Sequence, residues 1–381
     1  MAVGKCEHCY KILDTRLLNY NTHHCKHCGR CRTICHCRGR AGAMYVPSSH
    51  AAAIGSSSMY IKSRRAIGLE LELSEFGSWR VRRDEDGRLG KPPWTYPYTV
   101  THDGSVQPSG LEAVFNPMYG DQMILNGLNT IAEHVYTNDC KVNNTCGFHV
   151  HVNAQDWDWY DIQKMLTLWL KLERGTKLYS LCGRMPNTHC QTWTKWMAER
   201  GMTTLDPNIS KFKRDVLCLL YNVDTDRIPL EFGAADKSRD YKHRMQYHKE
   251  HPRDYPLPRR QDFVPTLTEL KRITHNRGWN RAVASRYLNL NIHSWKYRGT
   301  LEYRLGAGTV DPTDIRMWPL FCLWLTEAVT LTSIGIIRDM INSRIDPINR
   351  MVEQGGMYIP SIKGPTVYPM PGFLQTWITN K

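Results

Sequence analysis

Apolar and ionisable residues alternate along four short segments of the chain, and this alternation constrains the fold more than any other feature. The segments are IGLELEL (67–73), LEAVFNP (111–117), FHVHVN (148–153) and TLEYRL (300–305). Neighbouring side chains of a strand point to opposite faces, so each segment predicts a strand with one apolar and one ionisable face. We therefore expect a sheet whose apolar face packs on a core.

The other face of this sheet would carry carboxylates, imidazoles and a guanidinium group. Its candidate residues are Glu70, Glu72, Glu112, His149, His151, Glu302 and Arg304, with Asp103 in a turn just before the second segment. A solvated face of an antiparallel sheet is the alternative, but such faces usually mix Lys, Thr, Ser and Gln. Carboxylates two residues apart on a strand stand roughly 6–7 Å from each other. That spacing suits Mg²⁺ or Mn²⁺ ions that share a nucleotide phosphate, so the face predicts a metal–nucleotide site.

Helical periodicity covers much of the remaining sequence. Apolar residues recur at three- and four-residue spacing over 119–136 and 157–172, which predicts amphipathic helices. The apolar run 317–337 is long enough to span a membrane, but it carries Pro319 near its start and Glu327 at its middle. A carboxylate at mid-bilayer is costly, so we expect a buried helix and no membrane span. The elements together predict an α+β fold.

The N-terminal 37 residues hold seven of the thirteen cysteines, which marks a separate module. Cys6-x2-Cys9 and Cys25-x2-Cys28, with fifteen residues between them, have the spacing of a four-cysteine zinc ribbon. Cys31, Cys35 and Cys37 follow, with several histidines nearby, and a second zinc ion could use some of them. The run from Cys25 to Cys35 also has the spacing of an iron–sulfur motif, which would leave Cys6 and Cys9 without a role.

Composition divides the chain into a ribbon at 1–40, a linker at 41–63 and a catalytic domain at 64–381, with a basic, histidine-rich insertion at about 237–261. The net charge of +14 predicts attraction to anions, and nucleic acid is among them. The odd number of cysteines and the absence of an apolar signal at the N-terminus favour a reducing cytoplasm.

Five motifs in order resemble the amidoligase family, whose members are carboxylate–amine ligases of the glutamine synthetase and glutamate–cysteine ligase superfamily. They are IGLELEL, HDGSV with LEAVFNP, CGFHVHVN, RYLNLN and TLEYRLGAGT, between about residue 65 and the helix after residue 311. Neither the ribbon nor the basic insertion belongs to the resemblance, so the substrate would be particular to this protein.

The resemblance implies a curved antiparallel sheet with flanking helices that binds ATP and Mg²⁺ on its concave face. Amide formation would then pass through an acyl phosphate. By residue, it implies magnesium ligands at Glu70 and Glu72 and further ligands at Glu112 and Glu302. His149 or His151 would contact metal or phosphate. Arg304 would stabilise the phosphoryl group, and Arg286 is a weaker match for the same role. Asp103 would orient or deprotonate the amine.

Two other classes of function stay open at this point. His149-x-His151 could hold zinc or iron in a hydrolase, although Glu70, Glu72 and Arg304 would then be poorly explained. A zinc-ribbon protein that binds nucleic acid or builds a virion would show strongly salt-dependent binding to DNA or RNA. For the ligase, the charge points to an acidic or polymeric substrate, and the site could be completed across an oligomer.

Overall fold

The computed structural model describes residues 3–5, 12–14, 61, 63, 65–77, 98–108, 110–119, 121–154, 156–221, 287–360 and 366–381. The chain forms two compact units, one from Met1–Ala43 with Asp206–Arg281 and one from Met44–Leu205 with Ala282–Lys381. The described elements of the first unit are β1 (Val3–Lys5) and β2 (Ile12–Asp14), an antiparallel pair, and helix α7 (Ile209–Tyr221). All other described elements belong to the second unit.

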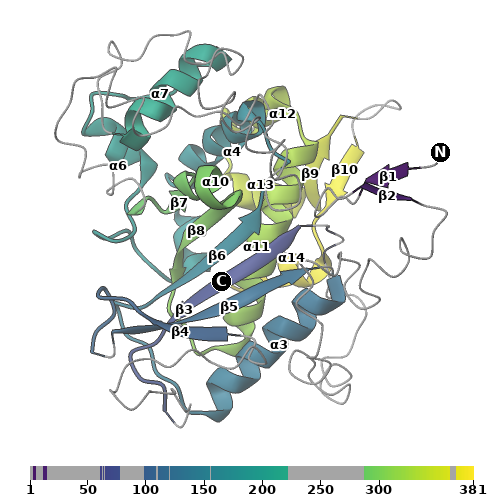
Figure 1. Cartoon of the computed structure of the whole chain (residues 1–381). Coiled ribbons are helices and arrows are strands. Elements are labelled where there is room, and N and C mark those ends of the chain that lie inside the picture. The colour runs from purple at the N-terminus through teal and green to yellow at the C-terminus, as the bar shows by residue number, and fades with distance from the viewer. Residues whose placement is uncertain are drawn as a thin grey trace. The chain divides into compact units, whose positions relative to one another are not determined.

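A six-stranded antiparallel sheet forms the centre of the second unit (Figure 1). Its order is β4-β5-β3-β6-β8-β7. The strands are β3 (Ala66–Glu72), β4 (Tyr98–His102), β5 (Leu111–Tyr119), β6 (Gly147–Asn153), β7 (Leu290–Asn291) and β8 (Thr300–Ala307). The four segments predicted from alternation are therefore strands, and they lie side by side as β5, β3, β6 and β8.

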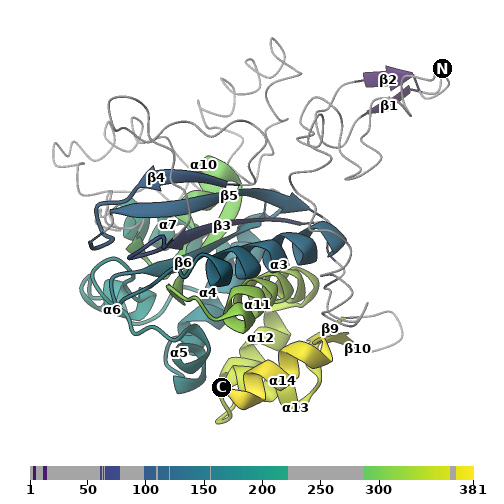
Figure 2. The same cartoon turned by 90° about the horizontal axis from the view of Figure 1, so that it is seen from below.

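Three helices cover the apolar face of this sheet, as Figure 2 shows. They are α3 (Asp121–Thr137), α4 (Trp159–Leu172) and α11 (Pro312–Leu331). The side chains between the layers, among them Leu69, Leu71, Phe148 and Val150, are almost completely buried. Burial of each stabilises the fold by about 1.5–3 kcal/mol. Helices on one face of an antiparallel sheet make this an α+β fold, as predicted.

The remaining elements of the second unit extend the helical layer and flank the end of the sheet at β7 and β8. They are α5 (Thr176–Cys182), α6 (Trp193–Ala198), α10 (His293–Arg298), α12 (Ile334–Ile341), α13 (Pro347–Glu353), β9 (Gly356–Ile359), β10 (Thr366–Pro369) and α14 (Gly372–Asn380). β9 and β10 form an antiparallel hairpin.

The predicted buried helix over 317–337 is two helices. Most residues of α11 from Ile315 to Val329 are buried, but α11 ends at Leu331 and α12 begins at Ile334. Thr332 is extended, and the Ser333 hydroxyl accepts a hydrogen bond from the Ile336 amide, which starts the second helix. Within the described residues, no single helix has both the length and the hydrophobicity of a membrane span. α11 and α12 have the length and hydrophobicity of a span only when they are taken together, and the chain bends by 120° between them.

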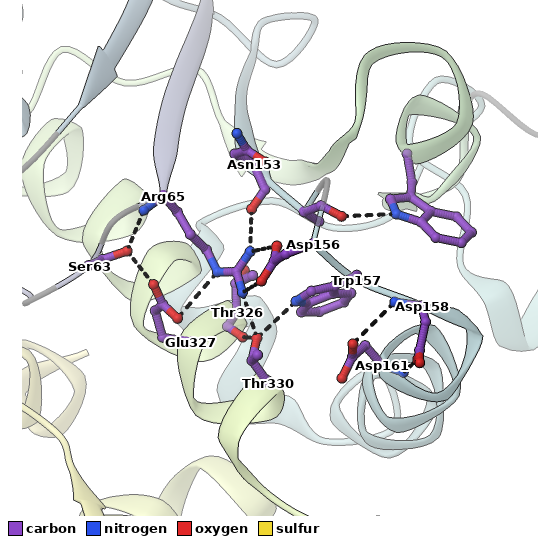
Figure 3. Close-up of polar contacts among 12 residues, drawn as sticks. Ser63, Arg65, Asn153, Asp156, Trp157, Asp158, Asp161, Thr326, Glu327 and Thr330 are labelled. Carbon is purple, nitrogen blue, oxygen red and sulfur yellow. Dashed lines mark hydrogen bonds and ion pairs between the residues drawn. The ribbon is translucent and has the colours of Figure 1, made fainter. Parts of the chain in front are cut away.

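Arg65 connects the start of β3 to the helical layer (Figure 3). Its guanidinium makes two hydrogen bonds to Asp156, at 2.5 and 2.7 Å, and donates to the carbonyl of Asn153 and the hydroxyl of Thr330. Its Nε lies 3.3 Å from Glu327 Oε2. The carboxylate that argued against a membrane span is thus one half of a partly buried ion pair.

Candidate functional site

Four neighbouring strands bring the predicted ionisable residues together on one face of the sheet. Glu70 pairs in register with His149, and Glu72 pairs with Glu112. On the other side of β6, His151 pairs with Glu302. Residues opposite one another on paired strands point to the same face, so the alternation predicted from the sequence converges into one cluster.

This face is not a solvated surface. The exposed fraction is 2% for His149, 7% for His151, 2% for Glu72 and 4% for Glu302. Ionisable groups are seldom buried to this extent unless they are paired or bind an ion. The alternative of a plain wet face is therefore wrong for these residues.

His149 lies at the centre of the cluster and contacts both carboxylates of β3. Its Nδ1 is 3.2 Å from Glu70 Oε2 and its Nε2 is 3.4 Å from Glu72 Oε1. His151 Nε2 lies 3.2 Å from the other oxygen of Glu70. Burial opposes the ionisation of Glu70, but the hydrogen bonds from His149 and His151 outweigh it and hold the pKa of Glu70 well below its ordinary value.

Glu302 is held by partners from two neighbouring elements. Its Oε2 accepts hydrogen bonds from Asn291 of β7, at 2.7 Å, and from Ser294 of α10, at 3.2 Å. Arg304 Nη1 donates to its Oε1 at 2.5 Å. Burial again opposes ionisation, but the charges of His151 and Arg304 lower the pKa of Glu302 below its ordinary value.

Glu112 behaves in the opposite way. Burial and the negative charge of Glu70 raise the pKa of Glu112 to about 7, although the Thr101 hydroxyl donates a hydrogen bond to it at 2.8 Å. Glu112 and Glu70 thus differ in protonation near neutral pH. A cation bound beside Glu112 would favour its ionised form.

Asp103 lies in the predicted turn after β4 and is half-buried. Its Oδ1 accepts hydrogen bonds from the Ser105 amide at 2.8 Å and the Ser105 hydroxyl at 2.6 Å. Burial opposes ionisation, but these bonds and the charges of His149 and Arg304 keep the pKa of Asp103 below its ordinary value. Asp103 is therefore a carboxylate near neutral pH.

Two groups of side chains in the cluster have the spacing of metal ligands. Glu70, His149 and Glu302 form one, and Glu72, Glu112 and His149 form the other, with the ligand atoms of each within 4.8 Å of one another. Carboxylate oxygens with a single imidazole suit Mg²⁺ or Mn²⁺ better than zinc, which favours nitrogen and sulfur. The donor set of either group fits a divalent ion, and because a neutral imidazole has one acceptor nitrogen, His149 can ligate only one of two ions.

Some predicted site residues lie outside the described residues. These are Arg286 and the cysteines of the N-terminal module, Cys6, Cys9, Cys25, Cys28, Cys31, Cys35 and Cys37. Conversely, one residue beside the cluster had not been predicted, Arg184, which follows the left-handed Gly183 at the end of α5. The only local sequence signal for Arg184 was its place directly after a Gly that ends a helix. Because the chain has 50 lysines and arginines, this signal does not single out Arg184 as a site residue.

A model of the family described as "Putative amidoligase enzyme" matches residues 62–228 and 234–326. The matched ranges contain all six strands of the sheet and every described site residue above. A search of curated proteins found no match, and a search of solved structures found none either.

Proposed function

Because the chain belongs to the amidoligase family, a family of ligase-type enzymes, we propose that it is an ATP-dependent carboxylate–amine ligase. The observation that carries this proposal is the pair of candidate cation clusters on one buried sheet face. Two divalent ions at short distance are a common arrangement for moving a phosphoryl group.

The proposed ligands follow from the two clusters. Glu70 and Glu302 would hold one Mg²⁺ or Mn²⁺ ion and Glu72 and Glu112 would hold the second, with His149 as a ligand of one of the two. Bound there, the ions would neutralise the phosphate oxygens of ATP. His151, which contacts Glu70 but belongs to neither cluster, would keep that carboxylate oriented.

The proposed reaction has two steps. The γ-phosphoryl group of ATP passes to a carboxylate oxygen of the acid, which releases ADP and leaves an acyl phosphate. The amine nitrogen then attacks the acyl carbon, the bond from that carbon to the phosphate oxygen breaks, and inorganic phosphate leaves as the amide forms. The amine loses its proton to a base in the second step.

Arg304 and Asp103 supply the charges that these steps need. Within the described residues, Nε of Arg304 has no hydrogen-bond partner, although Nη1 is held by Glu302. The guanidinium is thus fixed at one end and has a donor left for a phosphate oxygen. Asp103, ionised and half-buried, is the proposed base that orients the amine and accepts its proton.

The same geometry supports the ligase over the hydrolase considered for His149-x-His151. Each candidate cluster contains one imidazole, His149, together with two carboxylates. A zinc hydrolase would ordinarily use both histidines of the motif. Binding of nucleic acid by the basic chain remains an alternative outcome of the tests below.

Further proposals concern the type of sheet, the modules of the chain and the substrate. We propose a curved sheet of the glutamine synthetase and glutamate–cysteine ligase type, a zinc ribbon at 1–40 and a linker at 41–63 before the catalytic domain at 64–381. The net charge of +14 favours an acidic or polymeric acid substrate. Cytoplasmic localisation and oligomerisation belong to the same proposal.

The reaction can be tested with hydroxylamine as a surrogate amine, because it traps acyl phosphates as hydroxamates. We expect ADP and hydroxamate to form in equal amounts from a panel of acidic peptides with MgATP. Glu72→Gln should lower the rate by about a hundredfold or more, because it removes a charged ligand.

Glu75→Gln is the matched control for this variant. Glu75 lies three residues along the chain from Glu72, but it is exposed and pairs with Lys141 instead of the cluster. The control should retain the wild-type rate. Turnover by Glu72→Gln at the wild-type rate would refute the proposed site.

A further inference from the structure

Arg184 reaches the ionisable face of the sheet across Gly147. A Cβ atom on Gly147 would stand 2.4 Å from Arg184 Nη1, 2.9 Å from His149 Nε2 and 3.2 Å from Glu72 Oε2. These three atoms therefore lie within 3.2 Å of one point, which the missing side chain leaves open. The Gly147 amide donates a hydrogen bond to Glu72 at 2.5 Å, so the same residue fixes a proposed metal ligand.

The guanidinium group of Arg184 is buried but incompletely paired. The residue is only 9% exposed, and within the described part of the chain neither its Nε nor its Nη1 has a hydrogen-bond partner. Leaving charged donors buried and unsatisfied lowers the stability of a protein. Such an arrangement is expected where a ligand supplies the missing acceptors.

The ligand that fits this position is an anion. Arg184 stands beside Glu72 and His149, which belong to one candidate cation cluster, whereas Arg304 pairs with Glu302 of the other. An alternative role for Arg184 is to balance the negative charge of the nearby carboxylates, without binding a ligand. Once two divalent ions occupy the clusters, however, their four positive charges balance the four carboxylates, and the two guanidinium groups are left to pair with an anion.

Both arginines exert their positive charge on one buried thiol, that of Cys190. Burial raises the pKa of the Cys190 thiol to about 11, and the positive charges of Arg184 and Arg304 both oppose this rise. Both side chains thus lie within electrostatic range of the Cys190 thiol. Arg184 stands beside Glu72 and Arg304 beside Glu302, so a phosphoryl group bound between the two metal clusters would have a positive side chain close to each.

We propose that Arg184 is a further catalytic residue, whose guanidinium donates hydrogen bonds from Nη1 and Nε to the γ-phosphoryl group of ATP while Arg304 contacts the same group. This inference rests on the proposed function and adds a residue to it. Arg184 would stabilise the charge on the phosphoryl oxygens during transfer.

The test compares wild type, Arg184→Met and Arg184→Lys in binding and thermal unfolding. Without ligands, Arg184→Met should have an unchanged or higher Tm, because it removes an unpaired buried charge and keeps the volume of the side chain. Mn²⁺ alone should bind the variant as tightly as wild type or more tightly. Affinity for ATP in the presence of Mg²⁺ should fall roughly tenfold to a hundredfold. Affinity for ADP should change much less.

Arg184→Lys keeps the charge but loses the planar fork, so its ATP affinity should lie between the other two. Arg338→Met, which removes the same charge from the exposed side of α12, should bind ATP like wild type.

Several results would overturn the inference. A lower Tm of ligand-free Arg184→Met would show a structural role, and equal losses for ATP and ADP would place the contact away from the γ-phosphoryl group. Wild-type ATP affinity in the variant would refute this inference alone. The absence of Mg²⁺-dependent ATP binding in wild type would instead refute the proposed function itself.

Discussion

At the residue scale, Glu112 differs from its neighbours because it must ionise beside carboxylates that already carry charge. Burial and Glu70 together raise the pKa of Glu112 to about 7, whereas the pKa values of Glu70 and Glu302 lie below their ordinary range. A divalent ion must therefore displace a proton from Glu112 whenever the pH is below 7. Metal binding and proton release are coupled at this one residue.

This coupling predicts the pH dependence of metal affinity. The affinity for Mn²⁺ should fall by up to about tenfold for each pH unit below 7 through Glu112, and this dependence should level off above 7.5. Calorimetric titrations in two buffers of different ionisation enthalpy would also detect the released proton. Glu112→Gln should bind Mn²⁺ more weakly and release less of a proton at pH 6.5. A wild-type affinity that stays constant from pH 6 to pH 8 would contradict the role of Glu112.

The sequence predicts which residues share the face, but not how closely they approach. Alternation places Glu70 with Glu72 and His149 with His151, because the two-residue period of a strand is a local property. The pairing of His151 with Glu302 depends on the register between β6 and β8, which shifts by a bulge between Phe148 and Val150. Arg184 comes from the end of a helix, and only tertiary packing brings it to Gly147.

At the element scale, the Arg65 cluster joins the start of β3 and the end of β6 to α11. Asp156 receives two hydrogen bonds from Arg65, but its side chain is 58% exposed, whereas that of Glu327 is 15% exposed. Ser63 also donates a hydrogen bond to Glu327. Water screens the pair of Arg65 with Asp156 and hardly screens the pair of Arg65 with Glu327. The two carboxylates should therefore differ in their contribution to stability.

Mutation of Arg65, which both ion pairs share, and mutation of Asp156 alone should separate these contributions. Arg65→Met leaves Glu327 buried without its cation and should lower the free energy of unfolding by about 3 kcal/mol. Asp156→Asn should lower it by less than about 1 kcal/mol, because the lost pair is exposed. Urea unfolding followed by circular dichroism measures both changes. Equal losses in the two variants would contradict this assignment.

The helical layer shows where local sequence signals are insufficient. Residues 317–337 are largely apolar, so their periodicity predicts one buried helix, and only the Thr-Ser pair at 332–333 is a local signal of a break. The break occurs at Thr332 and Ser333, where the Ser333 hydroxyl caps the second helix and the Thr332 hydroxyl donates to the carbonyl of Tyr358 in β9. The second contact joins residues far apart in sequence. The length of α11 is therefore set by tertiary structure, whereas the existence of a buried helix was predictable.

At the scale of the whole molecule, the cysteine-rich N-terminus is a second proposed metal centre with a different donor set. Thiolates favour zinc, whereas the carboxylates of the sheet favour Mg²⁺ or Mn²⁺, so the two centres should load independently. We expect the double variant Cys6→Ser and Cys9→Ser to lose bound zinc, measured by mass spectrometry of the metal content. Its Mg²⁺-dependent ATP binding should be retained if it folds. Full zinc content in the double variant would show that Cys6 and Cys9 are not the ligands.

The central claim of this account is that the buried carboxylate face binds ATP together with divalent ions. The most direct measurement is a calorimetric titration of ATP into the wild-type protein and into Glu72→Gln and Glu75→Gln, each with and without Mg²⁺. We predict binding to wild type and Glu75→Gln that requires Mg²⁺, and loss of this binding in Glu72→Gln. No binding of millimolar ATP to wild type, or undiminished binding to Glu72→Gln, would contradict the claim and favour a metal hydrolase or a nucleic-acid-binding protein.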